Sequence, residues 1–159
     1  MCSFFATQIF SHPRLKDVTY YMRLDTDSLF TGRLCYDPFE VIHVHRRSYA
    51  WYYVGSDPPD VTVNLWPFLR NYSQTHPSVE HQLRANNWEW SQLDENGDET
   101  VRFIGYGNNF EVVRLEAFRR PEVKEWLDAL EGYPEGAFKW RWGTLKFQLI
   151  IGACLFTIL

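Results

Sequence analysis

Hydrophobic positions along the chain fall into short runs of β-branched and aromatic residues and into longer stretches with helical spacing. Residues 18–24, VTYYMRL, form a run of the first kind between polar residues, which predicts a buried strand. Residues 48–55, SYAWYYVG, predict a second strand, which the turn-forming residues 57–60 end. Residues 101–107, VRFIGYG, predict another, so we expect these runs to supply a sheet.

Helical spacing of apolar residues marks the segments between the predicted strands. Residues 61–80 and 81–90 show a spacing nearer to 3.6 than to 2, and we expect Pro67 and Pro77 to interrupt the helices there. The sequence YDPFEVI begins with a turn signal and predicts a short helix after Pro38.

An amphipathic helix is predicted for residues 121–130, which Gly132 and Pro134 are expected to close. The apolar side chains on its shared face are Val123, Trp126, Leu127 and Leu130. Strands that alternate with helices predict an α/β architecture, with a mixed sheet and flanking helices.

Composition narrows the class of protein. The 159 residues, 45% of them hydrophobic, are enough for one domain with a core. The seven Trp, nine Tyr and twelve Phe can serve as core residues or as flat platforms for sugar rings. A formal net charge of -4 without blocks of like charge gives no footprint for a phosphate backbone, so we expect no nucleic-acid partner.

The cysteines and the two ends of the sequence give no sign of a zinc site, a disulfide framework or a targeting segment. Three cysteines without a Cys-x-x-Cys spacing indicate neither a structural zinc site nor a disulfide framework. The first ten residues lack the pattern of a signal peptide or anchor. The apolar last 13 residues are shorter than a membrane-spanning helix of about 20 residues, so we expect a buried segment there.

Two aspartates, Asp25 and Asp27, follow the first predicted strand. If extended backbone continues that far, both carboxylates project to the same side and can share a divalent cation with a diphosphate. A polar turn that ends the strand is the alternative. An EF-hand calcium loop is excluded, because Leu29, Phe30 and Tyr36 stand where an oxygen ligand, a glycine and a glutamate are needed.

His43 and His45 lie in a stretch that we expect to be extended, in which imidazoles two residues apart can share a metal. The following Arg46 and Arg47 oppose cation binding, which favours structural or surface histidines. Residues 94–100, DENGDET, are expected to form a solvated turn. The chain contains no Gly-x-Gly-x-x-Gly, P-loop or Gly-x-Ser-x-Gly motif.

Glu111 lies between Phe110 and Val112 in residues 106–115, YGNNFEVVRL. A carboxylate flanked by bulky apolar residues can be desolvated and suited to proton transfer, nucleophilic attack or stabilisation of a developing cation. A glutamate at a helix start or a strand edge is the alternative, and the residues by themselves leave both open.

Taken in order, several segments resemble the GDP-mannose-dependent α-1,2-mannosyltransferases of the fungal Golgi, the glycolipid 2-alpha-mannosyltransferase family. The resemblance covers residues 1–143. The segments that carry it are MC followed by aromatics, SHPRL, YYMRLDTD, YDPFE, SYAWYY, LWPFL, YGNNFEVVRLEAFR and WRWG. It implies a Rossmann-like nucleotide-sugar glycosyltransferase domain that uses Mn²⁺, and a membrane-associated location in the Golgi lumen.

The resemblance also implies roles for four residues. The family's strand reads Tyr-Trp-Arg-Val-Glu-Pro-Asp where this chain has YMRLDTD, so Asp25 matches the metal ligand while Arg23 and Asp27 match substrate-binding positions. Aspartate in place of glutamate shortens the reach of the ligand by one methylene. Glu111 in NNFE matches the glutamate of the family's Ser-Asn-Phe-Glu, which implies that it is the catalytic residue facing the anomeric carbon.

The implied reaction is transfer of mannose from GDP-mannose to the 2-hydroxyl of a mannose-terminated glycan or glycolipid, with retention of configuration. Manganese would neutralise charge on the departing GDP. Glu111 would either attack the anomeric carbon or stabilise an oxocarbenium-like centre, and the sequence leaves this choice open.

The chain departs from the family in two places. Its opening Met-Cys matches an interior position, so we expect it to begin inside the catalytic domain, without the family's anchor, stem and N-terminal part of the nucleotide site. Gln148 stands where the family has a manganese-binding histidine. We therefore expect a partial catalytic domain in residues 1–143 and a divergent apolar tail in residues 144–159, for which a frameshift or a misplaced exon boundary is a hypothesis.

Two other functions remain open from the sequence. A noncatalytic carbohydrate-binding or interaction module would need a row of exposed Trp and Tyr that stack on sugars. A fragment without independent function would expose part of its core.

Overall fold

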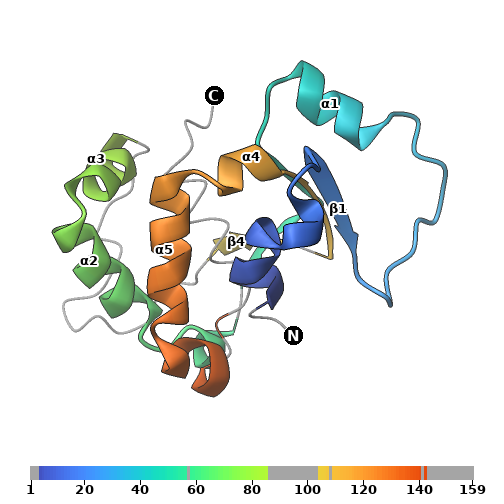
Figure 1. Ribbon diagram of the computed structural model, residues 1–159. Helices are drawn as coiled ribbons and strands as arrows, with labels where there is room; N and C mark the ends of the chain where they lie inside the picture. Colours follow the sequence, from blue (N-terminus) through green and yellow to red (C-terminus); the bar gives the residue numbers. More distant parts are fainter. Residues whose placement is uncertain (1–3, 57, 86–103, 108, 141, 143–159) are drawn as a thin grey trace.

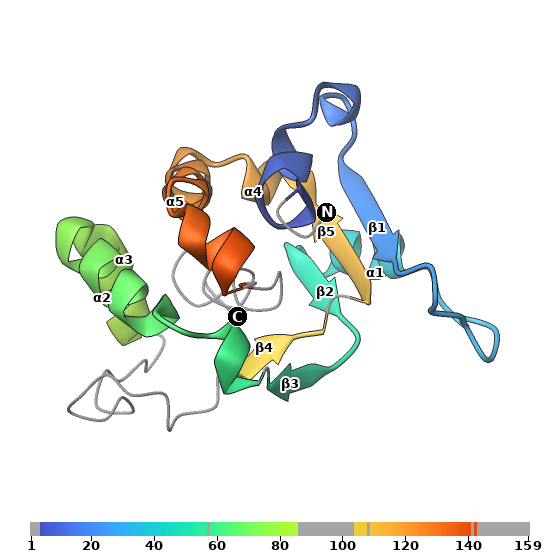
Figure 2. The same cartoon turned by 90° about the horizontal axis from the view of Figure 1, so that it is seen from below.

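The computed structural model describes residues 4–56, 58–85, 104–107, 109–140 and 142. Within them, three strands form an antiparallel sheet in the order β1-β5-β2. These strands are β1 (Tyr20–Leu24), β5 (Phe110–Arg114) and β2 (Tyr49–Trp51). β5 is therefore the central strand, although it comes last in sequence, and residues separated by about half the chain become neighbours (Figure 2).

A second, two-stranded sheet pairs β3 (Val54–Ser56) with β4 (Ile104–Tyr106) in antiparallel register. The expectation of one strand over residues 48–55 is thus wrong, because the strand ends at Trp51 and pairing resumes with another partner. The Tyr53 carbonyl accepts a hydrogen bond from Gly107 N–H at 2.6 Å. A β-carbon on residue 107 would lie only 2.2 Å from a ring carbon of Tyr53. The close approach of this ring to the backbone therefore requires glycine at position 107.

Five α-helices occur in the described part of the chain. They are α1 (Pro38–Val44), α2 (Leu65–Thr75), α3 (Pro77–Ala85), α4 (Leu115–Phe118) and α5 (Pro121–Glu131). The helix expected after Pro38 is confirmed, and Asp37 caps it by accepting a hydrogen bond from Phe39 N–H at 2.8 Å. The expected helix at 121–130 is confirmed as α5, which Gly132 ends with a right-handed φ of -67°.

Only one of the two prolines expected to interrupt helices does so. Pro67 lies in the first turn of α2, where the backbone N–H has no partner within the helix, and is therefore tolerated. The chain breaks instead at His76, and Pro77 begins α3.

Alternation along the strands gives the main sheet two different faces. On one face, Tyr20 contacts Phe39 and His43 of α1, at ring-centroid distances of 6.4 and 6.1 Å. On the other face, Tyr21 points into the core and meets Phe10 at 6.2 Å. Figure 2 shows α1 on one side of the sheet and α5 on the other. The sheet is thus covered on both sides by helical segments.

The core lies between the sheet and helices α2, α3 and α5. Its buried members are Ala6, Ile9, Phe10, Leu65, Trp66, Leu69, Tyr72, Val79, Val113, Leu115, Ala117, Phe118, Val123, Trp126, Leu127, Leu130 and Trp142. They include all four residues predicted for the apolar face of α5. None of the described helices is both long and apolar enough to cross a membrane.

Arg119 ties the N-terminal segment to the end of α4. Its guanidinium donates to the carbonyls of Phe10 at 2.9 Å and Leu15 at 2.5 Å, with longer contacts to Lys16 and Val18. These carbonyls belong to short helical turns and a loop, where regular pairing does not satisfy them. One side chain therefore fixes the segment that leads into β1.

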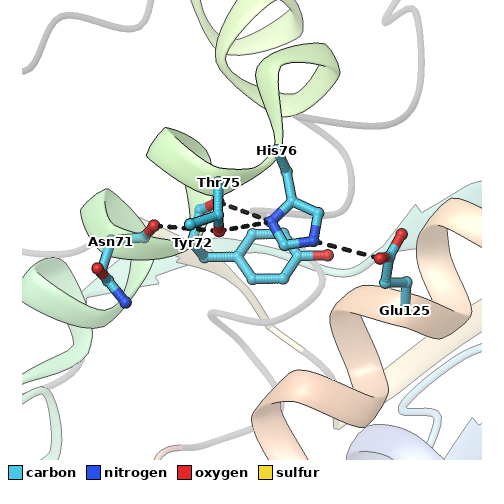
Figure 3. A network of polar contacts seen from close by, with 5 residues as sticks. All are labelled: Asn71, Tyr72, Thr75, His76 and Glu125. Atoms are coloured by element: carbon cyan, nitrogen blue, oxygen red, sulfur yellow. Dashed lines mark hydrogen bonds and ion pairs between the residues drawn. The ribbon is translucent and has the colours of Figure 1, made fainter.

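His76 links the junction of α2 and α3 to α5 (Figure 3). Its ring stacks on Tyr72 with centroids 3.8 Å apart, and its Nδ1 lies 2.8 Å from the Tyr72 carbonyl. Nε2 lies 3.3 Å from a carboxylate oxygen of Glu125 on α5. Thr75 donates to the Tyr72 carbonyl at 2.9 Å, which completes the network.

Candidate functional site

Glu111 is the second residue of the central strand β5 and has no exposed surface. Both carboxylate oxygens have a phenol donor. The Tyr21 hydroxyl donates to Oε1 at 2.7 Å, and the Tyr49 hydroxyl donates to Oε2 at 2.8 Å. The alternative of a helix start or strand edge is therefore wrong, and this glutamate is a buried, hydrogen-bonded carboxylate.

The antiparallel register explains how two tyrosines reach one carboxylate. Tyr21 of β1 and Tyr49 of β2 are both paired with Val113 of β5, two residues beyond Glu111. Residues two apart on a strand share a face, so all four side chains project to the core side of the sheet. The phenols then reach Glu111 diagonally from the strands on either side.

Burial and the nearby negative charge keep both phenols protonated. Desolvation is the largest cause that raises the pKa of Tyr21 and of Tyr49 far above the usual tyrosine value. The charge of Glu111 and the hydrogen bonds to it raise each pKa further, and Arg23 opposes this effect weakly. Both hydroxyls therefore act as hydrogen-bond donors throughout the physiological pH range.

Arg23 brings a positive charge to the same face. It is paired with Glu111 in the register of β1 and β5, and its guanidinium lies 4.8 Å from the centroid of the Phe5 ring. Nε and one terminal nitrogen contact the same oxygen of Asp25, Oδ1, at 3.0 and 2.9 Å. The other terminal nitrogen is buried and has no hydrogen-bond partner among the described residues.

The two aspartates do not lie side by side. Asp25 N–H donates to the Asn109 carbonyl at 2.9 Å, which extends the pairing by one residue, but Ser28 N–H then closes a turn onto the Asp25 carbonyl. Asp27 lies within that turn and is exposed. Extended backbone thus ends before Asp27, and the expectation that both carboxylates project together is not met. The polar turn describes this stretch better.

The described residues do not form a complete metal site. They bring no three His, Cys, Asp or Glu side chains together as a ligand set. Asp25 follows directly after β1, and one of its oxygens is already held by Arg23. A cation at Asp25 would need further ligands and would lie close to a guanidinium, which repels it.

The expectation of extended backbone at His43 and His45 is wrong. His43 lies in α1 and His45 is its C-cap residue, because the Asp37 cap and Pro38 start a helix there. Residues two apart on a helix point in different directions, so these imidazoles do not share a face. His43 Nδ1 instead lies 2.8 Å from the Tyr20 hydroxyl, which supports the interpretation as a structural or surface histidine.

An aromatic stack borders the site. Trp51 is paired with Glu111 across β2 and β5, and its ring lies 3.9 Å from that of Tyr106 at an interplanar angle of 22°. The neighbouring Tyr52 is 73% exposed, and Trp51 and Tyr53 are partly exposed. These aromatics therefore offer flat apolar surface near the edge of the sheet that carries Glu111.

Tyr21 and Tyr49 were missing from the sequence interpretation. Each lies in an aromatic run, where its ring predicts packing and its hydroxyl gives no separate signal. Residues 94–100, Gln148 and the predicted tail at 144–159 lie outside the described residues, so the expectations for them stay predictions.

Comparison with known families gives one match over nearly the whole chain. The sequence profile of the family described as glycolipid 2-alpha-mannosyltransferase matches residues 1–157. The chain is 28% identical over 143 residues to probable mannosyltransferase KTR3 of Saccharomyces cerevisiae. It is 27% identical over 157 residues to alpha-1,2 mannosyltransferase KTR1 of the same yeast. These matches cover 90% and 98% of this chain, but only 34% and 38% of the relatives.

Solved structures confirm the fold. The chain matches the mannosyltransferase Ktr4p of S. cerevisiae in complex with GDP with a TM-score of 0.78 and 22% identity, over 99% of this chain and 40% of that one. Core-mannan synthase A of Aspergillus fumigatus in a Mn/GDP form matches with a TM-score of 0.77 and 22% identity, over 96% and 42%. The expected α/β fold class is thus confirmed, and every strand pair in the described residues is antiparallel.

Proposed function

The chain belongs to the glycolipid 2-alpha-mannosyltransferase family, and from this premise we propose that it supplies part of the active site of a retaining α-1,2-mannosyltransferase. The proposed donor is GDP-mannose and the proposed acceptor is a mannose-terminated glycan or glycolipid. The observation that carries the proposal is the buried carboxylate of Glu111, held by two phenols on a face that also bears Arg23. The proposed location is the Golgi lumen, in association with the membrane.

Glu111 is the proposed catalytic residue. In the transfer, the bond between the anomeric carbon and the phosphate oxygen breaks, and GDP leaves with the bonding electrons. The acceptor oxygen forms the new bond on the same face, either directly or by displacing the carboxylate after that has attacked, and its proton passes to the departing diphosphate. A negative charge in a buried site stabilises the cationic carbon strongly, whether or not a covalent bond forms. Since Glu111 has no exposed surface, a substrate reaches it only when neighbouring side chains move.

Arg23 is the proposed contact to the donor. One of its terminal nitrogens is buried without a hydrogen-bond partner among the described residues, and a diphosphate oxygen would satisfy it. Asp27, exposed in the turn after β1, is proposed as a second substrate-binding residue on the resemblance alone. The GDP complex of a relative with the same fold supports a nucleotide-sugar donor.

Manganese is the proposed cofactor, and Asp25 is the proposed residue of this chain that contacts it. A related structure is a Mn/GDP form. When bound, the ion would neutralise negative charge on the diphosphate as a Lewis acid. The described residues supply one carboxylate, and its Oδ1 is shared with Arg23, so no step of the transfer is assigned to the metal here.

A carbohydrate-binding module without catalysis is the second candidate. The consecutive, partly exposed aromatics Trp51, Tyr52 and Tyr53 favour it. Under this candidate, mannosides would quench tryptophan fluorescence, and Trp51→Ala would abolish the quenching. Loss of the carboxylate in Glu111→Gln would leave it unchanged.

The test is incubation of the chain with GDP-mannose and an α-mannoside acceptor, with and without Mn²⁺. We expect GDP release coupled to a new α-1,2-linked mannose, detected by the anomeric proton in NMR spectra, and we expect Mn²⁺ to increase the rate. Binding of mannosides without any transfer would favour the binding module and overturn the proposal.

A further inference from the structure

We infer that Tyr21 and Tyr49 are positioning residues that hold the Glu111 carboxylate in one orientation for transfer, an inference that rests on the proposed function of Glu111. No substrate contact is assigned to either tyrosine. Each phenol binds a different oxygen of the carboxylate, at 2.7 and 2.8 Å, from the strands on opposite sides of β5.

Two hydrogen-bond donors, one on each oxygen, restrict the orientation of the Glu111 carboxylate more than a single donor could. A single hydrogen bond holds one carboxylate oxygen, so the group can still rotate about that hydrogen bond and move its other oxygen. With Tyr21 on Oε1 and Tyr49 on Oε2, such a rotation breaks at least one hydrogen bond. Because Glu111 is fully buried, breaking one of these hydrogen bonds inside the protein costs more than it would in water, so one orientation of the carboxylate plane is preferred.

The phenols are themselves held by the core. The Tyr21 ring lies 6.2 Å from Phe10, and the Tyr49 ring lies 6.1 Å from Phe118. Phe10 and Phe118 stack on one another with centroids 4.5 Å apart, and both are fully buried. The two hydroxyls are thus presented by one continuous aromatic cluster. Rigid support of this kind is what a preorganised site requires, because the groups need not reorganise during the reaction.

Neutral phenols suit this role chemically. Their raised pKa values keep them protonated, so they donate hydrogen bonds to the carboxylate of Glu111. When charge on one oxygen falls during attack, or when a cation develops nearby, the phenol on the other oxygen continues to hold the group. A purely structural pair of tyrosines would stabilise the fold but would leave the rate of transfer unaffected once the protein had folded.

The test compares Tyr21→Phe and Tyr49→Phe with the matched control Tyr20→Phe. Tyr20 is the adjacent residue on β1, and its hydroxyl faces the other side of the sheet, 2.8 Å from His43 Nδ1. The first measurement is the ¹³C NMR resonance of the Glu111 carboxyl carbon in the intact chain, assigned by its loss in Glu111→Gln. We expect each of the two variants to shift this resonance and Tyr20→Phe to leave it in place. An unshifted resonance in all three would overturn the inference.

The second measurement separates orientation from binding. We expect Tyr21→Phe and Tyr49→Phe to lower kcat by roughly ten- to a hundredfold, the worth of one hydrogen bond to a charged group, with the KM for GDP-mannose unchanged. If Glu111→Gln retains full turnover, the proposed catalytic role of Glu111 is wrong. The NMR result alone then decides whether Tyr21 and Tyr49 orient the Glu111 carboxylate. If Glu111→Gln is inactive while the tyrosine variants match Tyr20→Phe in kcat, the positioning role is wrong and the proposed function stands.

Discussion

Arg23 lies directly opposite Glu111 in the register of β1 and β5, yet its guanidinium binds Asp25, whose Oδ1 it contacts through two nitrogens at 2.9 and 3.0 Å. The side chain thereby places one positive charge directly on the proposed metal ligand, from a strand position that is paired with the proposed catalytic residue. The positive charge of Arg23 opposes a cation at Asp25 and favours an anionic donor. Removal of that charge should therefore change the affinities for Mn²⁺ and for GDP in opposite directions.

Replacing Arg23 with glutamine should strengthen the binding of Mn²⁺ alone and weaken the binding of GDP. Removal of a neighbouring cation lowers the electrostatic cost of placing Mn²⁺ at Asp25, and we expect roughly tenfold tighter binding. The Mn²⁺ affinity is measured by titrating the protein with Mn²⁺ and following the electron paramagnetic resonance signal of the free ion.

Arg114→Gln is the matched control for Arg23→Gln, because Arg114 forms an equally short ion pair with Glu116 on the exposed surface. We expect little change in Mn²⁺ affinity for the control. Equal or weaker Mn²⁺ binding by Arg23→Gln than by Arg114→Gln would show that Asp25 does not hold the ion.

High pH should destabilise the protein through Tyr21 and Tyr49. The pKa of each is raised by burial first and by Glu111 second, so both stay protonated in the folded state while they ionise in the unfolded chain. Their stabilising contribution is complete below about pH 10 and falls as the pH rises further, by about 1.4 kcal/mol per pH unit for each phenol. Urea unfolding followed by tryptophan fluorescence between pH 8 and pH 11.5 measures the slope.

Tyr21→Phe should make this slope shallower by the share of one phenol, and the exposed Tyr52 provides the control. Tyr52→Phe should leave the slope as it is. A slope in Tyr21→Phe equal to that of the unchanged chain would contradict the assignment of a raised pKa to Tyr21.

Arg119 should contribute far more to the free energy of unfolding than the adjacent Arg120. Truncation to alanine leaves the carbonyls of Phe10 and Leu15 without their donor, and we expect a loss of roughly 2–4 kcal/mol in the free energy of unfolding. Arg119→Lys should lose most of this as well, because an ammonium cannot reproduce the fork of a guanidinium. Urea unfolding measures these losses.

Arg120→Ala is the control, because it removes only an exposed ion pair with Glu122, and it should cost less than about 1 kcal/mol. Equal losses at both positions would refute the role of Arg119.

His76 should contribute to the packing of the α2–α3 junction on α5. His76→Ala removes the stack on Tyr72 and the contact to Glu125, and we expect a loss of roughly 1–2 kcal/mol. Thermal unfolding by circular dichroism measures it, with the exposed His81→Ala as the control. A variant as stable as His81→Ala would mean that the network in Figure 3 adds nothing to stability.

Local signals predicted the helices well. Asp37 with Pro38, and the apolar face that begins at Val123, act over four to ten residues, so the sequence contains the whole cause. The same local reasoning failed for His43 and His45, because the extended interpretation gave no weight to the cap at Asp37 that starts a helix through them.

The site itself could be predicted only in part. Glu111 was identifiable from its apolar neighbours, but its partners lie 90 and 62 residues away and meet it only through strand pairing. Register between distant strands is a tertiary property that single-strand patterns do not encode. The stretch from Asp25 to Asp27 likewise left open whether the strand continues or a polar turn ends it, and the hydrogen bond from Ser28 N–H to the Asp25 carbonyl favours the turn.

The most direct test of the central claim is the rate of mannose transfer from GDP-mannose by Glu111→Gln, beside the unchanged chain and Glu116→Gln. Glu116 is exposed, so its substitution controls for the same chemical change outside the site. We expect Glu111→Gln to lose turnover by roughly a thousandfold and Glu116→Gln to keep it. Turnover by Glu111→Gln equal to that of Glu116→Gln would contradict the account.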